Sequence, residues 1–178
     1  MTVDLATQQR GLLALIVGTD VPDLDLTTDP YLAEVAASPA LPVARGIAAS
    51  WRAYTLRRLC PLTWAALDQN GQLRPTLDRL GRRPVSPFLR LLAAAFTDEA
   101  AADAAERGDA LVTAIATFER GVVLPGAAGD RTVIEWPCDP EDTLRALLEG
   151  RPLLELAPAP HRTEAPADDP TALTIEAL

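Results

Sequence analysis

The hydrophobic pattern of this chain changes near residue 124, and that change constrains the fold more than any other feature. Before it, apolar residues recur at helical spacing. After it, the apolar runs are short and rich in β-branched and aromatic residues, beginning with TVIEWP. The intervening LPGAAGDR supplies one proline and two glycines. The sequence therefore predicts an α+β protein with a helical domain at 1–123, a linker at 124–131 and a small module at 132–178.

Prolines, glycines and capping residues divide the helical domain into shorter helices. Two alternatives stay open at Pro61, which either kinks one long helix near Leu59 or begins a second helix. Asp98 is expected to cap the last helix, and Gly108 is a point where that helix can break. The expected helices cover residues 5–18, 30–37, 42–67, 73–80, 87–96 and 98–122.

The module at 132–178 is expected to have β-α-β-β order. TVIEWP predicts a strand, and Asp139 with Pro140 begins a helix that Gly150 ends. LLELAPA at 153–159 predicts the second strand, and LTIEAL at 173–178 predicts the third after a polar turn. Because a module of roughly fifty residues buries little surface by itself, we expect it to pack on the helices.

Charge is distributed unevenly along the chain. The net charge of −9 argues against general nucleic-acid binding. Residues 45–90 nevertheless hold nine arginines against Asp68 and Asp78, a local balance of about +7 that leaves about −16 elsewhere. There is no lysine, so every side-chain cation of this segment is a guanidinium that can bind a carboxylate through two parallel hydrogen bonds. An acidic surface or an acidic peptide would suit this segment.

The sequence lacks the usual marks of a catalytic or metal site. Walker A, GxGxxG, HExxH and GxSxG patterns are absent, and the one histidine, His161, has no cysteine or histidine near it. Acidic pairs such as Asp98 with Glu99 fall at expected helix starts, where they cap free N–H groups. Cys138 lies between a strand and a helix, which can activate a thiol, although burial is the commoner fate of free cysteines such as Cys60 and Cys138. We therefore expect no catalytic residue and no cofactor in this chain.

The N-terminal sequence MTVDLATQQRGLLALIVG lacks the basic region of a secretory signal. No stretch reaches the roughly 18 apolar residues that a membrane span requires. The two cysteines are too far apart in sequence to suggest a disulfide framework. These observations predict a cytoplasmic protein without a membrane partner.

Aromatic and basic residues are densest in SWRAYTLRRLCPLTWAAL, at residues 50–67. Arginines and large aromatic residues dominate the energetics of protein interfaces, so the segment predicts a binding face. The alternative is that its tryptophans lie in the core and its arginines are solvated. The residues predicted to contact a partner are Arg52, Tyr54, Arg57 and Arg58.

Four segments carry a resemblance to a known family: ARGIAASWRAYTLRRLCPLTWAAL, FLRLLAAAFTDE, FERGVV and TVIEWPCDPEDTLRALLEGRPLLEL. Over roughly residues 40–157 the chain resembles the partner subunits of multinuclear non-haem iron oxidative enzymes, of which the methanobactin-pathway partner is the best-known kind. Those enzymes modify residues of ribosomally made peptides. A family described as DNA-binding has a similar helical N-terminal domain.

The resemblance implies a heterodimer with a TIM-barrel iron enzyme, in which the iron belongs to the enzyme and this chain supplies no ligand. It also implies that the leader of a precursor peptide adds as a strand to the C-terminal module. The strands expected to receive it contain Val133, Ile134 and Trp136, or Leu153, Leu154 and Leu156. Two alternatives come from other classes: a DNA-binding regulator that uses the arginine-rich helices, and a thiol enzyme that uses Cys138.

Overall fold

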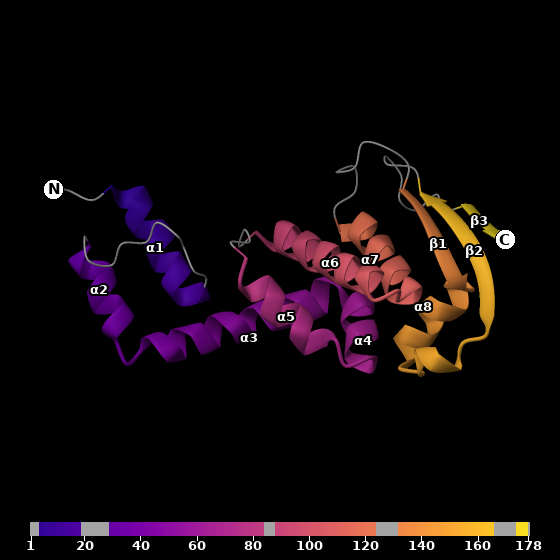
Figure 1. Ribbon diagram of the computed structural model, residues 1–178, viewed down its shortest axis with the longest axis horizontal. Coiled ribbons are helices and arrows are strands. Elements are labelled where there is room, and N and C mark those ends of the chain that lie inside the picture. Colours follow the sequence, from indigo (N-terminus) through magenta and orange to yellow (C-terminus); the bar gives the residue numbers. More distant parts are fainter. Residues whose placement is uncertain (1–3, 19–28, 84–87, 124–131, 166–173, 178) are drawn as a thin grey trace.

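The computed structural model describes residues 4–18, 29–83, 88–123, 132–165 and 174–177, and it has an α+β fold (Figure 1). The linker predicted at 124–131 lies outside the described residues. The elements follow in the order α1 (Leu5–Val17), α2 (Pro30–Ala37), α3 (Leu41–Leu59), α4 (Pro61–Gln69), α5 (Leu73–Gly81), α6 (Leu89–Glu106), α7 (Ala110–Val123), β1 (Thr132–Cys138), α8 (Pro140–Glu149), the 3₁₀ turn η1 (Leu153–Glu155), β2 (Pro158–Ala165) and β3 (Thr174–Ala177).

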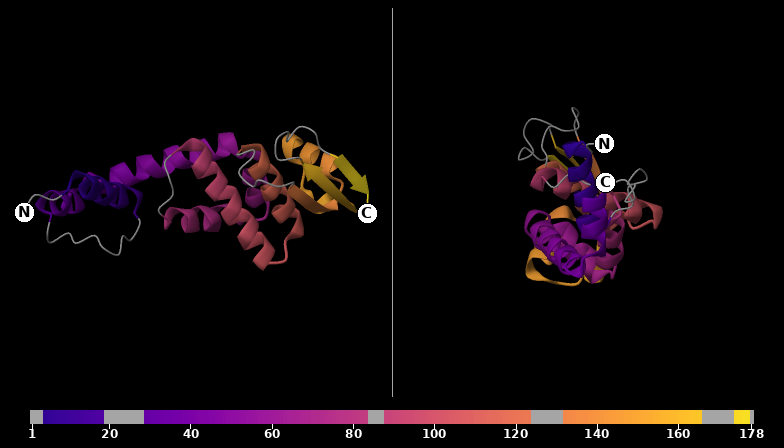
Figure 2. Two further views of the ribbon diagram at one scale, coloured as in Figure 1. Left: turned by 90° about the horizontal axis from the view of Figure 1, so that it is seen from above. Right: turned by 90° about the vertical axis from the view of Figure 1, so that its left-hand side faces the viewer.

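The molecule is elongated, with α1 and α2 at one end and the sheet at the other (Figures 1 and 2). Helices α1 and α2 contact each other and α3, and a small core of Leu15, Leu32 and Leu41 joins them. Local signals set their bounds as expected. Gly18 adopts a φ of 79° at the end of α1, and the Asp29 carboxylate accepts the Tyr31 and Leu32 N–H groups before α2. The long helix α3 connects this unit to the rest of the protein.

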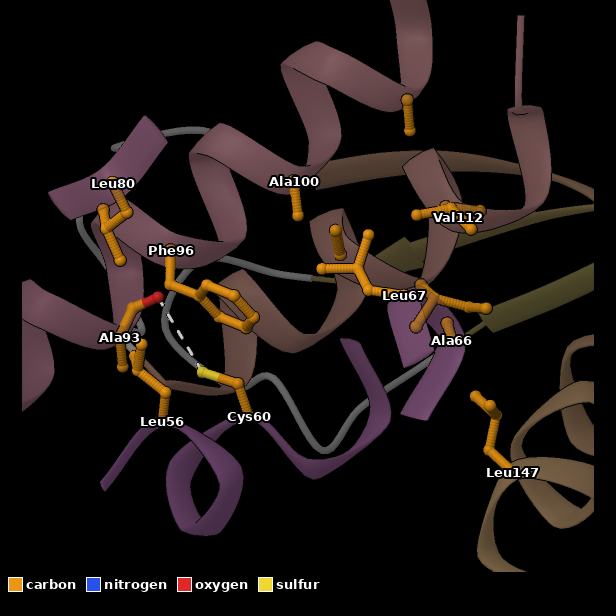
Figure 3. Packing of buried hydrophobic residues seen from close by; sticks show 14 of the residues in the cluster. Leu56, Cys60, Ala66, Leu67, Leu80, Ala93, Phe96, Ala100, Val112 and Leu147 are labelled. Atoms are coloured by element: carbon orange, nitrogen blue, oxygen red, sulfur yellow. Dashed lines mark hydrogen bonds between the residues drawn. The ribbon is translucent and has the colours of Figure 1, made fainter. Parts of the chain in front are cut away.

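The main hydrophobic core lies among α3, α4, α6 and α7 (Figure 3). Leu56, Phe96 and Ile115 are fully buried there. Small residues of α6, such as Ala93 and Ala100, are also fully buried and allow close helix packing. Ile134, Trp136 and Leu147 belong to the same cluster, so the β-α-β-β module shares the core of the helices, in agreement with its small size.

The helix breaks follow proline and glycine more closely than acidic residues. Pro61 begins the separate helix α4, which resolves the two alternatives. The predicted break before Asp98 is wrong, because α6 runs without interruption from Leu89 to Glu106. Asp98 and Glu99 therefore lie inside a helix and do not cap one. The chain breaks at Gly108 instead, whose φ of 73° is readily adopted only by glycine.

The sheet is antiparallel with the order β1-β2-β3. The strand predicted at LLELAPA is wrong: Leu153–Glu155 forms the turn η1, and β2 begins at Pro158. The segment interpreted as a polar turn around His161 is therefore the central strand. Prolines disfavour a central strand, but in the described part of the sheet β3 pairs with His161–Glu164, and Pro158 and Pro160 precede this paired stretch.

Candidate binding surfaces

Helix α3 carries a stripe of exposed apolar side chains, which we call the α3 stripe. It consists of Val43, Ile47, Trp51 and Tyr54, which are 50–66% exposed. These residues recur at helical spacing, and that spacing is usual for a face turned toward the core. Contiguous exposed apolar residues with Trp and Tyr are typical of interaction surfaces. The alternative that the tryptophans of this segment lie in the core therefore fails for Trp51, whereas Trp64 packs against the main core.

Two arginines extend the α3 stripe at the C-terminal end of the helix. The Arg58 guanidinium lies 5.8 Å from the centroid of the Tyr54 ring, and its Nη1 donates a hydrogen bond to the Tyr54 hydroxyl at 3.2 Å. Arg57 is also exposed in the last turn, where a cation is favoured by the helix dipole. The structure thus places Tyr54, Arg57 and Arg58 together on one accessible end of α3.

Arg52 does not share that face. It is partly buried, and its Nη1 would lie 3.8 Å from a Cβ atom at Gly81, so its guanidinium lies near the end of α5. Partial burial lowers the pKa of Arg52 below its usual value, although an arginine remains charged at neutral pH. Arg52 therefore belongs to the inner side of α3, between the two cores.

Much of the local positive charge in residues 45–90 is used within the fold. Arg79 Nε and Arg83 Nη1 lie 3.0 and 2.8 Å from the carboxylate of Glu99, which is 6% exposed. Arg74 pairs with Asp78 on α5, and Arg45 Nε donates to the Leu15 carbonyl at 2.7 Å. The excess of arginines is consequently not one uniform basic surface.

The free edge of β1 borders a groove against α7. Among the described residues β1 pairs only with β2, and its other edge carries no strand. A hollow of about 500 Å³ is lined by Val133, Ile134 and Glu135. Since consecutive residues of a strand point to opposite faces, a groove that touches all three runs along the strand edge. Its opposite wall consists of the small residues Ala110, Thr113, Ala114 and Thr117 of α7.

The predicted strand residues have different environments. Val133 is 43% exposed at the groove, and Ile134 is 4% exposed. Trp136 is 2% exposed, its Nε1 donates to Thr163 Oγ1 at 2.9 Å, and Phe118 meets it edge-on, so this side chain belongs to the core. β1 is thus the only one of the two predicted strands that the structure forms.

Leu153, Leu154 and Leu156 do not form a second peptide-binding strand. The Leu153 N–H donates to Gln69 Oε1 at 2.9 Å, and the Leu153 side chain packs on the main core. Leu154 is 99% exposed, and Leu156 directly follows η1. The alternation of apolar and other residues in LLELAPA predicted a strand, and that prediction is wrong. Pro152 leads into a 3₁₀ turn, which the Gln69 side chain of α4 stabilises.

Neither cysteine lies in an environment that activates a thiol. Burial, and secondly the charge of Glu119, raises the pKa of Cys60, whose Sγ donates to the Ala93 carbonyl at 3.8 Å (Figure 3). Burial also raises the pKa of Cys138. A nucleophilic thiol requires the opposite shift. The geometry therefore gives no support to a thiol enzyme.

Other polar groups have structural partners. His161 Nδ1 lies 2.7 Å from the Ala159 carbonyl, and its Nε2 lies 3.5 Å from Asp139 Oδ2.

Within the described ranges, no group of three or more His, Cys, Asp or Glu residues is arranged to hold a metal ion. No helix in the described part of the chain is long and apolar enough to cross a membrane.

Two buried carboxylates were missed by sequence reasoning. Glu99 lies between α5 and α6, and Glu119 on α7 accepts hydrogen bonds from the start of α4. Their partners are 16 to 57 residues away in sequence, so no local pattern identifies them. The exposure of the α3 stripe was equally unpredictable, because its spacing matches that of a buried face.

No protein family model matches the chain, and neither does a curated protein or a solved structure.

Proposed function

We propose that this chain is a non-catalytic partner subunit that binds an iron-dependent TIM-barrel oxidative enzyme and presents a precursor peptide to it. The proposal combines the sequence resemblance over residues 40–157 with two accessible surfaces, the free edge of β1 and the α3 stripe. The chain itself would supply no iron ligand and no cofactor, and the complex would form in the cytoplasm.

The free edge of β1 is the observation that carries the proposal. An edge strand offers every second N–H and C=O group to an added strand, and these main-chain hydrogen bonds provide affinity independent of sequence. The groove beside β1 gives an extended peptide room, because the facing positions of α7 are Ala or Thr. A leader peptide would pair with β1 and place alternate side chains against α7.

The α3 stripe supplies a separate surface for the enzyme. Trp, Tyr and Arg are the residue types that contribute most to the binding energy of protein interfaces. Trp51, Tyr54 and Arg58 are all exposed on α3. Figure 1 shows that α3 runs from the end of the molecule that holds α2 toward the main body, and that β3 lies at the opposite end. Enzyme and leader could therefore bind together without competing for the same residues.

Co-expression with a TIM-barrel iron enzyme, if a neighbouring gene encodes one, tests the proposal. We expect the two proteins to elute as one complex from size-exclusion chromatography, and a labelled leader peptide to bind this chain in fluorescence anisotropy. Separate elution, together with no leader binding, would show the proposal to be wrong.

The DNA-binding alternative is tested in the same preparation. Phosphate contacts make DNA affinity fall steeply with salt. The ion pairs of Arg79 and Arg83 with Glu99 leave fewer free cations for such contacts than the sequence suggests. A steeply salt-dependent DNA affinity in the absence of leader binding would favour the regulator.

A further inference from the structure

A cleft lies along α3 between α1 and the main body, and Ile47 and Trp51 of the α3 stripe line one side of it. It has a volume of about 470 Å³ and reaches Arg83 and Leu92 at the body. α1 contacts α2 and α3 but makes no extensive contact with the described helices of the body (Figures 1 and 2). The walls are apolar and include Leu13, Ile16, Val17, Ala44, Ile47 and Trp51.

Among the described residues, the ionisable side chains that line this cleft are those of Arg52 and Arg83, and both are basic. Arg83 is neutralised by Glu99 at 2.8 Å. Arg52 has no carboxylate partner among the described residues, although it is partly buried. The cleft therefore combines an apolar wall with one guanidinium that lacks a counter-charge.

A second hollow of about 520 Å³ continues from Arg52 and Val17 on the other side. It adds Arg45, Arg74 and Arg82 to the lining, and the acidic residue among the described ones that line it is Asp78, which Arg74 already binds. The two hollows share Val17 and Arg52 in their linings, and the second is the more basic of the two. A complementary occupant needs apolar side chains at one end and carboxylates toward Arg52 and beyond.

We propose that this cleft receives an acidic amphipathic segment of a partner protein, with one of its carboxylates paired to Arg52. The open side of the cleft favours a segment over a small molecule. Ile47 and Trp51 are 66% and 50% exposed on the rim, so an occupant that covers them must extend along α3. A helix with apolar residues at spacings of three and four presents such a ridge.

Arg52 supplies specificity in this arrangement. Partial burial lowers the pKa of Arg52. It also strengthens the attraction between its guanidinium and a bound carboxylate, because less water surrounds the pair. A basic or purely apolar segment would leave the guanidinium without a counter-charge. This inference goes beyond the proposed function, since the cleft accepts such a segment whichever protein supplies it.

A random library of peptides of about 16 residues, displayed on phage, is the probe. It is selected on the full chain and counter-selected on Ile47→Glu, which places a negative charge on an exposed position of the cleft wall. We expect enriched peptides to carry Asp or Glu beside apolar residues at helical spacing. Synthetic versions should bind at least about tenfold more weakly to Arg52→Gln and to Ile47→Glu. They should bind Arg145→Gln, with its arginine on α8, as they bind the parent.

Peptides in which Gln replaces Asp and Glu should lose affinity by a similar factor. The proposal is overturned if no peptide survives counter-selection, if enriched peptides are basic, or if Arg52→Gln binds them as the parent does. Arg52-dependent binding to anionic phospholipid vesicles, with no peptide enriched, would also overturn it and identify a membrane as the occupant. Neither the iron enzyme nor a leader peptide is present, so failure here is distinct from failure of the proposed function.

Discussion

Glu119 on α7 caps the start of α4: its Oε2 accepts a hydrogen bond from the Thr63 N–H at 2.8 Å. Oε1 of the same carboxylate accepts the Leu62 N–H at 2.9 Å. No side chain near Cys60 caps this helix, and the first N–H groups of a helix have no partner within it. A residue 56 positions away in sequence thus completes the helix that Pro61 begins.

Replacing Glu119 by alanine should destabilise the protein. The Leu62 and Thr63 N–H groups would lose their acceptor, and we expect the free energy of unfolding to fall by about 1–3 kcal/mol. Urea denaturation measures it. Glu106→Ala is the matched control, because Glu106 is exposed at the end of α6. Equal stability of the Glu119 and Glu106 variants would contradict the capping role.

Stability should also depend on pH through Glu119. Burial is the largest influence on its pKa and raises it, which outweighs the hydrogen bonds from Thr63 and Leu62. The folded protein therefore holds this proton more tightly than the unfolded chain does. The contribution is present below the ordinary glutamate pKa and is lost as pH rises through the raised pKa. Glu119→Ala should lack this component in urea titrations performed across that range, and an unchanged pH profile would refute it.

The Glu99 carboxylate should matter more for stability than an exposed ion pair of similar length. Glu99→Gln removes the charge that Arg79 and Arg83 share, and we expect a loss of about 1–3 kcal/mol. Arg74→Ala breaks the Arg74–Asp78 pair, whose side chains are 85% and 50% exposed, and should cost less than about 0.5 kcal/mol. Thermal or urea denaturation of both variants compares them. A larger effect at Arg74 would reverse this ranking.

Leader binding should depend on the groove beside β1. Ala110→Trp fills the groove from an exposed position on α7, so affinity for a labelled leader should fall at least about tenfold. Ala102→Trp introduces the same side chain at an exposed position of α6 outside the groove and should bind as the parent does. Proline at Val133 and at Glu135 provides a second test, since a lost N–H donor weakens pairing. Circular dichroism must show that each variant is folded. Parental affinity in all folded variants would move the leader site elsewhere.

The end of the α3 stripe should contribute to complex formation with the enzyme. Arg57→Ala and Arg58→Ala remove exposed guanidinium groups, and Arg58→Ala also removes the contact with Tyr54. A desolvated arginine at an interface contributes up to a few kcal/mol, and a rim arginine contributes less than about 1 kcal/mol. Isothermal titration calorimetry with the enzyme separates these cases. Arg145→Ala, on α8, is the control. If all three variants bind alike, the enzyme does not contact this end of α3.

Local signals predicted most of the helices and β1. Proline at positions 30, 61 and 140, glycine at 18 and 150, and the caps Asp29 and Asp139 all act within a few residues, so they can be recognised without a structure. The same reasoning failed for Asp98. An acidic pair resembles a cap, but α6 continues through it because Asp98 reaches Arg120 on α7 at 2.9 Å and Glu99 reaches the arginines of α5.

The candidate surfaces were only partly predictable. Tyr54, Arg57 and Arg58 lie together as the composition suggested, whereas Arg52 points to the other side of α3. Leu153, Leu154 and Leu156 were misassigned, because alternation alone does not distinguish a strand from a turn held by a distant side chain. Gln69 holds that turn from α4 by accepting the Leu153 N–H and donating to the Arg151 carbonyl.

The sequence by itself determined the fold class, the position of the change from helices to strands, and the helix ends set by proline and glycine. These features depend on backbone conformations and capping bonds formed between near neighbours. Only the tertiary structure decided that the α3 stripe faces solvent, that β1 is an edge beside a groove, and that Glu119 caps α4. Each of these depends on which surfaces other elements cover, and burial by residues distant in sequence leaves no local pattern.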